Sequence, residues 1–134
     1  MNKQEMADKI VALVQRLGGG VSFVEMQREC GPESQGELGL GMGVEGTNVY
    51  LWAGCSELFI DAFSIARDSL DGTPTSLLIY LVDGQGLNWP LAMRVPKKGY
   101  KTPHWMPMSF KLKKERAYDP WNTERNGRVV AKSG

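Results

Sequence analysis

The beginning of the chain carries apolar residues at helical spacing. They fall three or four positions apart, which places them on one face of a helix; these residues are Met6, Ile10, Leu13, Val14 and Leu17. Asn2 and Glu5 fit a capping box at the start of this helix, and the glycines at 18–20 predict its end. Ser22 and Glu25 form a second capping box directly afterwards. The pattern therefore predicts two consecutive helices.

The pattern changes at residues 31–46, where six glycines and few apolar residues predict a loop. The run 41–46 matches G-x-G-x-x-G, but a glycine-rich segment precedes it and a strand-like segment follows. A dinucleotide site needs a strand before the motif and a helix after it, so we expect a flexible loop here. Residues 48–53 are β-branched and aromatic, which predicts a short strand. A third helix, capped by Ser56 and lined by a broad apolar stripe, is predicted over 56–70.

A β-hairpin is predicted after the third helix. Residues 77–82 are apolar throughout, which favours a buried strand, and the sequence DGQG at 83–86 is typical of a hairpin turn. Residues 87–95 alternate apolar and polar positions, as a returning strand does. Pro90 has no N–H to donate to a neighbouring strand, so we expect this strand at a sheet edge.

The remaining residues combine proline with basic side chains and show no regular period. We expect 96–110 to pack on the body as an extended arm, because it holds too many large apolar groups for a solvated tail; these are Tyr100, Trp105, Met106, Met108 and Phe110. Beyond Lys111 we expect disorder or marginal order. The predicted organisation is a domain at 1–96, a basic aromatic arm at 97–116 and a disordered tail at 117–134.

The order helix, helix, short strand, helix and hairpin resembles a winged helix-turn-helix domain over residues 2–96. The segments that carry the resemblance are the glycines at 18–20, the helix start at 21–27, the helix at 56–70 and the hairpin at 77–95. Small phage and prophage proteins of this size look similar. The resemblance implies an α+β, winged-helix-like fold with three helices, a short strand and a C-terminal hairpin wing, followed by a basic arm. It also implies DNA binding and transcription regulation.

The distribution of charge modifies that expectation. The chain has 16 Lys and Arg against 15 Asp and Glu, a formal net charge of only +1. Residues 1–93 hold 5 basic and 12 acidic side chains, whereas 94–134 hold 11 basic and 3 acidic ones, which gives −7 and +8. A basic C-terminal part joined to an acidic body is typical of an arm that meets polyanions.

The third helix is a poor candidate for reading DNA, because Glu57, Asp61 and Asp68 oppose phosphates there. About 25 residues also separate Cys30 from Ser56, whereas a helix-turn-helix has a tight turn between its helices. We therefore expect nucleic-acid contacts from the wing and arm, where lysines and arginines neutralise phosphates and aromatic rings stack on bases. The candidate residues are Arg94, Lys97, Lys98, Tyr100, Lys101, Trp105, Lys111, Lys113, Lys114 and Arg116.

Three alternatives remain open at this point. In the first, Tyr100, Trp105 and Phe110 cover the core, and the lysines around them are merely solvated. In the second, the acidic helical surface with Glu57, Asp61 and Asp68 docks onto a basic partner protein, as in phage-type inhibitors or adaptors. In the third, the arm of one copy meets the body of another and forms a homodimer.

Catalytic and metal chemistry find little support in the sequence. His104 is the single histidine, and its Pro-His-Trp setting has no neighbouring nucleophile or carboxylate. Cys30 and Cys55 lie 25 positions apart without a CxxC motif, so no zinc site or redox pair is expected. We expect a non-enzymatic protein without cofactor. Apolar runs are too short for a membrane span, and we expect a cytoplasmic protein.

Overall fold

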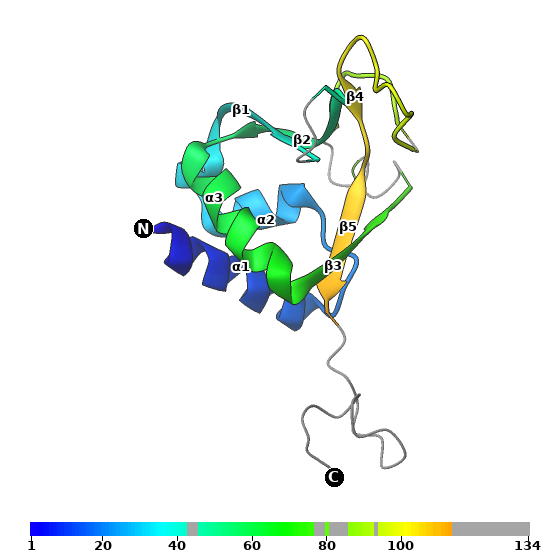
Figure 1. The fold of residues 1–134 in the computed structure, drawn as a ribbon. Coiled ribbons are helices and arrows are strands. Elements are labelled where there is room, and N and C mark those ends of the chain that lie inside the picture. The colour runs from blue at the N-terminus through cyan, green and yellow to red at the C-terminus, as the bar shows by residue number, and fades with distance from the viewer. Residues whose placement is uncertain (43–45, 77–79, 81–85, 93, 114–134) are drawn as a thin grey trace, which may run out of the picture.

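A computed structural model of the chain describes residues 1–42, 46–76, 80, 86–92 and 94–113 (Figure 1). In this part the chain forms an α+β fold with three α-helices and two small sheets. The elements in chain order are α1 (Lys3–Leu17), α2 (Phe23–Cys30), the 3-10 turn η1 (Pro32–Ser34), β1 (Gln35–Gly41), β2 (Val49–Cys55), α3 (Glu57–Ala66), the 3-10 turn η2 (Arg67–Ser69), β3 (Leu70–Pro74), β4 (His104–Trp105) and β5 (Met108–Leu112). None of the described helices is long and apolar enough to span a bilayer.

The helix starts and ends follow the sequence signals. The Asn2 side chain accepts a hydrogen bond from the Glu5 N–H at 2.8 Å, and the Glu5 carboxylate accepts one from the Asn2 N–H at 2.9 Å. Ser22 and Glu25 form the same reciprocal pair at the start of α2. Gly18 ends α1 in the left-handed conformation with φ 81°. Both predicted capping boxes are confirmed, and α1 packs against α2 and α3.

The first sheet has the order β1-β2-β4 and corrects one prediction. The strand expected at 48–53 is confirmed as β2, but the loop expected over 31–46 is wrong where β1 pairs antiparallel with β2. β1 buries only Leu40, and Leu38 and Leu40 are its only large apolar side chains, too few to identify a strand. Its glycines have a packing reason, since a side chain at Gly36 would collide with the backbone of Cys55. β2, and not a helix, follows the G-x-G-x-x-G run.

The second sheet pairs β3 antiparallel with β5, and the segment from β4 to β5 connects the two sheets. β4 pairs parallel with β2, and β5 also bridges Val21, just before α2. The end of the predicted third helix is wrong by a few residues: α3 ends at Ala66, η2 follows, and Leu70 already belongs to β3.

The predicted hairpin wing is not shown by the structure. The strand expected at 77–82 and the turn at 83–86 lie outside the described residues, apart from Tyr80 and Gly86. A returning strand is expected at 87–95. Among its described residues, Leu91 forms an isolated parallel bridge to Trp105, and no continuous strand pairing is found. The Trp105 N–H donates to the Pro90 carbonyl at 2.9 Å, so this segment lines up with β4. The tail expected at 117–134 also lies outside the described residues.

The core is built around aromatic rings from distant parts of the chain. The Phe23 ring contacts those of Trp52, Phe63 and Phe110, with centroids 5.0 to 6.2 Å apart. One buried polar group fixes the relation of α2 to β2: the Gln27 side chain accepts a hydrogen bond from Trp52 Nε1 at 2.8 Å. Its Nε2 donates to the carbonyls of Ser34 and Gly54, both at 3.0 Å. Both the oxygen and the nitrogen of the buried Gln27 amide therefore have hydrogen-bond partners.

Candidate nucleic-acid interface

The structure separates the predicted basic residues into two groups. Four of them lie in one loop, residues 94–101, which we call the basic loop; they are Arg94, Lys97, Lys98 and Lys101, all exposed. Lys111 and Lys113 lie at the far end of β5, beyond the β4–β5 segment (Figure 1). Eight residue steps from β4 to the end of β5 span about 26 Å in extended chain. The structure therefore does not bring these cations together. Lys114 and Arg116 lie outside the described residues.

The tip of the basic loop is a tight turn. The Gly99 N–H donates to the Pro96 carbonyl at 2.9 Å, which places Lys97 and Lys98 at the two central positions. Gly99 has φ 71°, and a side chain there would collide with the backbone of Gly46 and Thr47. Glycine is thus required both for the conformation and for the close approach. The turn presents its two lysines to solvent from a fixed backbone.

Tyr100 ties the basic loop to the chain that leads into β2. Its N–H donates to the Thr47 carbonyl at 2.9 Å, and its carbonyl accepts from Asn48 Nδ2 at 2.8 Å. The Tyr100 hydroxyl donates to the Arg94 carbonyl at 3.2 Å, which closes the loop on itself. His104 stacks on one face of the Tyr100 ring, with centroids 3.6 Å apart and ring planes 10° from parallel. The loop is held by side-chain and backbone bonds at both ends.

Asn48 also helps to fix the basic loop. Its φ of 54° lies in the left-handed region, which asparagine tolerates better than most residues. The Asn48 carbonyl also accepts a hydrogen bond from the His104 N–H at 2.8 Å. A small apolar cluster of Val49, Ala92 and Met106 packs next to these contacts. The local backbone is therefore specified by several independent interactions.

Trp105 does not belong to an exposed interface. Its side chain is fully buried, and its Nε1 donates to the Leu51 carbonyl at 3.1 Å. The ring contacts Trp52 and Tyr80, with centroids 5.7 and 4.9 Å apart. The expectation that Trp105 stacks on bases is therefore corrected, because no face of the ring is open to a ligand. Phe110 is buried as well, so the expected packing of 96–110 on the body is confirmed for these rings.

The charges of the basic loop are not neutralised within the described part of the chain. The ion pairs found there join the N-terminal amine to Glu33 and Arg16 to Glu29, and neither involves the loop. Residues 94–104 contain no Asp or Glu. Exposed cations without an acidic partner produce a positive local potential, which attracts phosphates.

The surface of α3 and η2 has the opposite sign. Glu57, Asp61 and Asp68 are exposed, and none of them forms an ion pair with another described residue. The other side of α3 is buried against the core through Phe59 and Phe63. This helix therefore presents carboxylates to solvent and opposes a nucleic-acid backbone, as the sequence indicates.

Groups suited to catalysis are not assembled in the described residues. Burial raises the pKa of the Cys30 thiol to about 11 and that of Cys55 to about 12, so both are protonated at neutral pH. His104 Nδ1 lies 2.9 Å from the Thr102 carbonyl, a backbone contact without a nucleophile. The described residues also contain no group of three or more His, Cys, Asp or Glu side chains placed to hold a metal ion.

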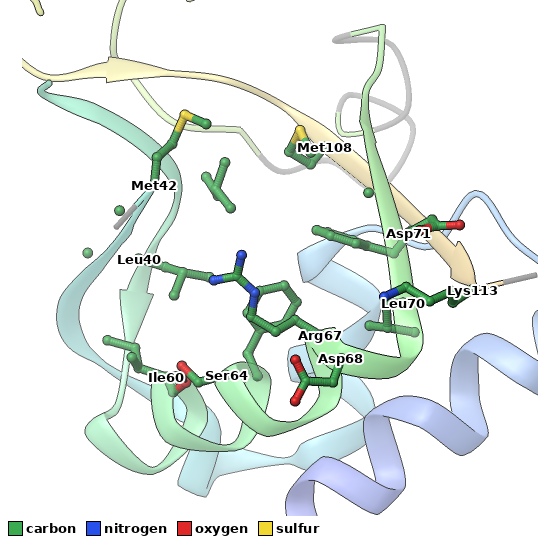
Figure 2. A pocket seen from close by; sticks show the side chains of 16 residues that line it. Leu40, Met42, Ile60, Ser64, Arg67, Asp68, Leu70, Asp71, Met108 and Lys113 are labelled. Carbon is green, nitrogen blue, oxygen red and sulfur yellow. Dashed lines mark hydrogen bonds between the residues drawn. The ribbon is translucent and has the colours of Figure 1, made fainter. Parts of the chain in front are cut away.

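A pocket of about 680 Å³ lies between β1, α3, β3 and β5 (Figure 2). Sequence patterns did not indicate it, because its lining comes from β1, β2, α3, η2, β3 and β5, which are separated along the chain. Its floor contains apolar side chains such as Leu40, Phe63 and Met108, and its rim carries Arg67 and Lys113. The pocket is a second candidate site, distinct from the basic loop.

Comparisons with protein-family models, with curated proteins and with solved structures find no match to this chain.

Proposed function

We propose that this protein is a non-enzymatic nucleic-acid-binding module that contacts the phosphate backbone through the basic loop. The observation that carries the proposal is the turn at Pro96–Gly99, which holds Lys97 and Lys98 in solvent on a backbone fixed by Tyr100. A solvated tail of lysines would not need a left-handed glycine packed against Gly46 and Thr47. Because specific contacts fix the backbone of this loop, a binding role for its lysines is favoured over a role in solubility alone.

The chemistry of the loop suits phosphates better than bases. Each Lys or Arg that neutralises a phosphate releases bound counterions, which gives affinity without sequence selectivity. The Tyr100 ring has one face covered by His104, so it offers less stacking surface than a free aromatic side chain. Binding therefore comes mainly from charge and falls steeply with salt. The winged-helix interpretation is part of this proposal, with contacts made beside the wing and not by α3.

The test is a salt-titrated binding measurement by fluorescence anisotropy, with random-sequence duplex and single-stranded DNA. On duplex DNA, log affinity should fall with log salt by about 0.9 for each phosphate contact. The double variant Lys97→Gln/Lys98→Gln should bind at least about tenfold more weakly at low salt, with a slope shallower by about 1.8. Its matched control is Lys3→Gln/Lys9→Gln, which removes the same charge from exposed positions of α1.

The two double variants decide the proposal together. If the control weakens binding as much as the loop variant, net charge alone explains the affinity and the loop has no special role. If neither DNA form binds to the unmodified protein at low salt, the nucleic-acid proposal is wrong. Equal slopes for the loop variant and the unmodified protein would also contradict it.

A second candidate function uses the acidic surface of Glu57, Asp61 and Asp68. The supporting observation is that all three are exposed and unpaired within the described part of the chain. Such a surface suits a basic partner protein, as in the inhibitor or adaptor alternative, or the basic loop of a second copy. Reversing the three carboxylates to Lys should abolish capture of such a partner. Capture that survives the triple reversal would exclude this surface.

A further inference from the structure

We propose that the pocket between β1, α3, β3 and β5 binds a small amphipathic anion, with an apolar body on the pocket floor and an acidic group at Arg67. This site is separate from the basic loop and does not depend on the nucleic-acid proposal. Its volume of about 680 Å³ falls in the usual range for small-molecule sites of about 300 to 1,000 Å³.

The floor of the pocket is apolar and comes from elements that the core holds in place. Its apolar lining includes Leu40, Ile60, Phe63, Met108 and Phe110. Phe63 and Phe110 contact each other at a centroid distance of 5.3 Å, so the floor is fixed by aromatic packing. An added side chain at Gly72 would collide with the Phe110 ring, so glycine at this position allows the ring to lie directly against β3. A rigid apolar floor favours a hydrophobic ligand body.

Arg67 determines the charge of the ligand. Figure 2 shows its side chain extending from the end of α3 over the pocket toward Leu40 and Met42. The guanidinium forms no ion pair with any described residue, although Asp68 is its neighbour in sequence. The Asp71 carboxylate points away from the pocket in the same view. An unpaired guanidinium beside an apolar floor selects a carboxylate, sulfonate or phosphate group, which it can bind through two parallel N–H donors.

The charge arrangement favours a small ligand over a nucleic acid at this site. Asp68 also lines the pocket, and its carboxylate would repel a chain of phosphates. Arg67 and Lys113 line the same pocket, and their two positive charges attract a single acidic group. The occupant is therefore a small molecule with one anionic end.

The experiment uses 8-anilino-1-naphthalenesulfonate as the anionic probe and N-phenyl-1-naphthylamine as its neutral counterpart. Titrations of the full chain are followed by fluorescence and calorimetry. We expect saturable binding of one anionic probe per chain. Arg67→Gln should weaken the anionic probe by about tenfold, the effect of losing one charge-assisted contact, and leave the neutral probe unchanged. Ile60→Trp, which fills the pocket from α3, should weaken both probes.

The matched control for charge is Arg28→Gln, because Arg28 is exposed on α2 and does not line this pocket. The unfolding temperatures of Arg67→Gln and Arg28→Gln should equal that of the unmodified protein, since both side chains are exposed and neither forms an ion pair with a described residue. The proposal is overturned if the anionic probe does not saturate, or if Arg28→Gln weakens it as much as Arg67→Gln. Unchanged binding in Ile60→Trp would also overturn it, because the probe would then lie elsewhere.

Discussion

The basic loop at 94–101 and the segment at 104–112 are neighbours in sequence but have opposite roles. The segment buries Trp105, Met106 and Phe110 and pairs with strands of both sheets. The loop exposes all four of its cations and is fixed by a turn and by Tyr100. Aromatic and basic residues that look interleaved in sequence are therefore divided in space, with the large rings inside and the charges outside. An interleaved pattern alone does not indicate a stacking interface.

The largest expected effect is on stability, from Trp105→Ala. Removing a fully buried indole leaves a cavity and removes the hydrogen bond to the Leu51 carbonyl, so the free energy of unfolding should fall by about 3 to 5 kcal/mol. Urea unfolding followed by circular dichroism measures this loss. A Trp105→Ala protein of unchanged stability but reduced DNA affinity would show that the ring is an interface residue after all.

The next largest effect should come from Gly99→Ala in the basic loop. Alanine there must adopt a positive φ and also collide with the backbone of Gly46 and Thr47, so we expect a loss of about 1 to 3 kcal/mol. The matched control is Gly18→Ala, where φ is 81° but nothing lies within 4 Å of the new side chain. The difference between the two unfolding free energies measures the collision alone. Equal losses would mean that the loop does not press against residues 46–47.

Alkaline pH should destabilise the folded protein through its two buried thiols. Burial raises the pKa of Cys30 to about 11 and that of Cys55 to about 12, so the folded state keeps protons that the unfolded state loses first. The free energy of unfolding therefore falls as pH rises above about 9. In Cys55→Ala this decline should be shallower, as measured by urea unfolding at several pH values. An identical pH dependence in the variant would show that the thiol is not buried.

The smallest effect on stability is expected for Lys97→Gln/Lys98→Gln. Both side chains are exposed and make no ion pair with described residues, so the unfolding free energy should change by less than about 0.5 kcal/mol. DNA affinity should nevertheless fall. Thermal unfolding and the DNA-binding assay, carried out on the same variant, should show a loss of affinity without a loss of stability. The opposite is expected for Trp105→Ala. A loss of stability comparable to that of Gly99→Ala would mean that these lysines hold the loop together.

Local signals predicted the helices well, because capping boxes and glycine ends act within a few residues. Asn2 with Glu5 and Ser22 with Glu25 needed no tertiary information. β1 escaped the sequence analysis because its pairing with β2 depends on glycines that allow a close approach, and these glycines leave only two large apolar side chains, Leu38 and Leu40. β3 and β5 lie far apart in sequence, as the pairs Leu70–Leu112 and Pro74–Met108 show. Neither segment contains a local pattern that identifies the other as its partner strand.

The candidate sites were predictable to different degrees. The cations of the basic loop were visible in the charge distribution, but the turn at Gly99 and the Tyr100 contacts that fix them were not. Lys111 and Lys113 looked like part of the same cluster, because sequence proximity hides the length of an extended strand. The sequence does not indicate Arg67 as a candidate site residue, because its proposed role depends on the pocket that it lines.

The most direct test of the account is a nuclear magnetic resonance titration of the isotope-labelled protein with a short DNA duplex at low salt. We predict that the largest amide shift changes occur at Lys97, Lys98, Gly99 and Lys101, with little change along α3 and at Lys111. Shift changes centred on α3, or spread evenly over all exposed lysines, would contradict the assignment of binding to the basic loop.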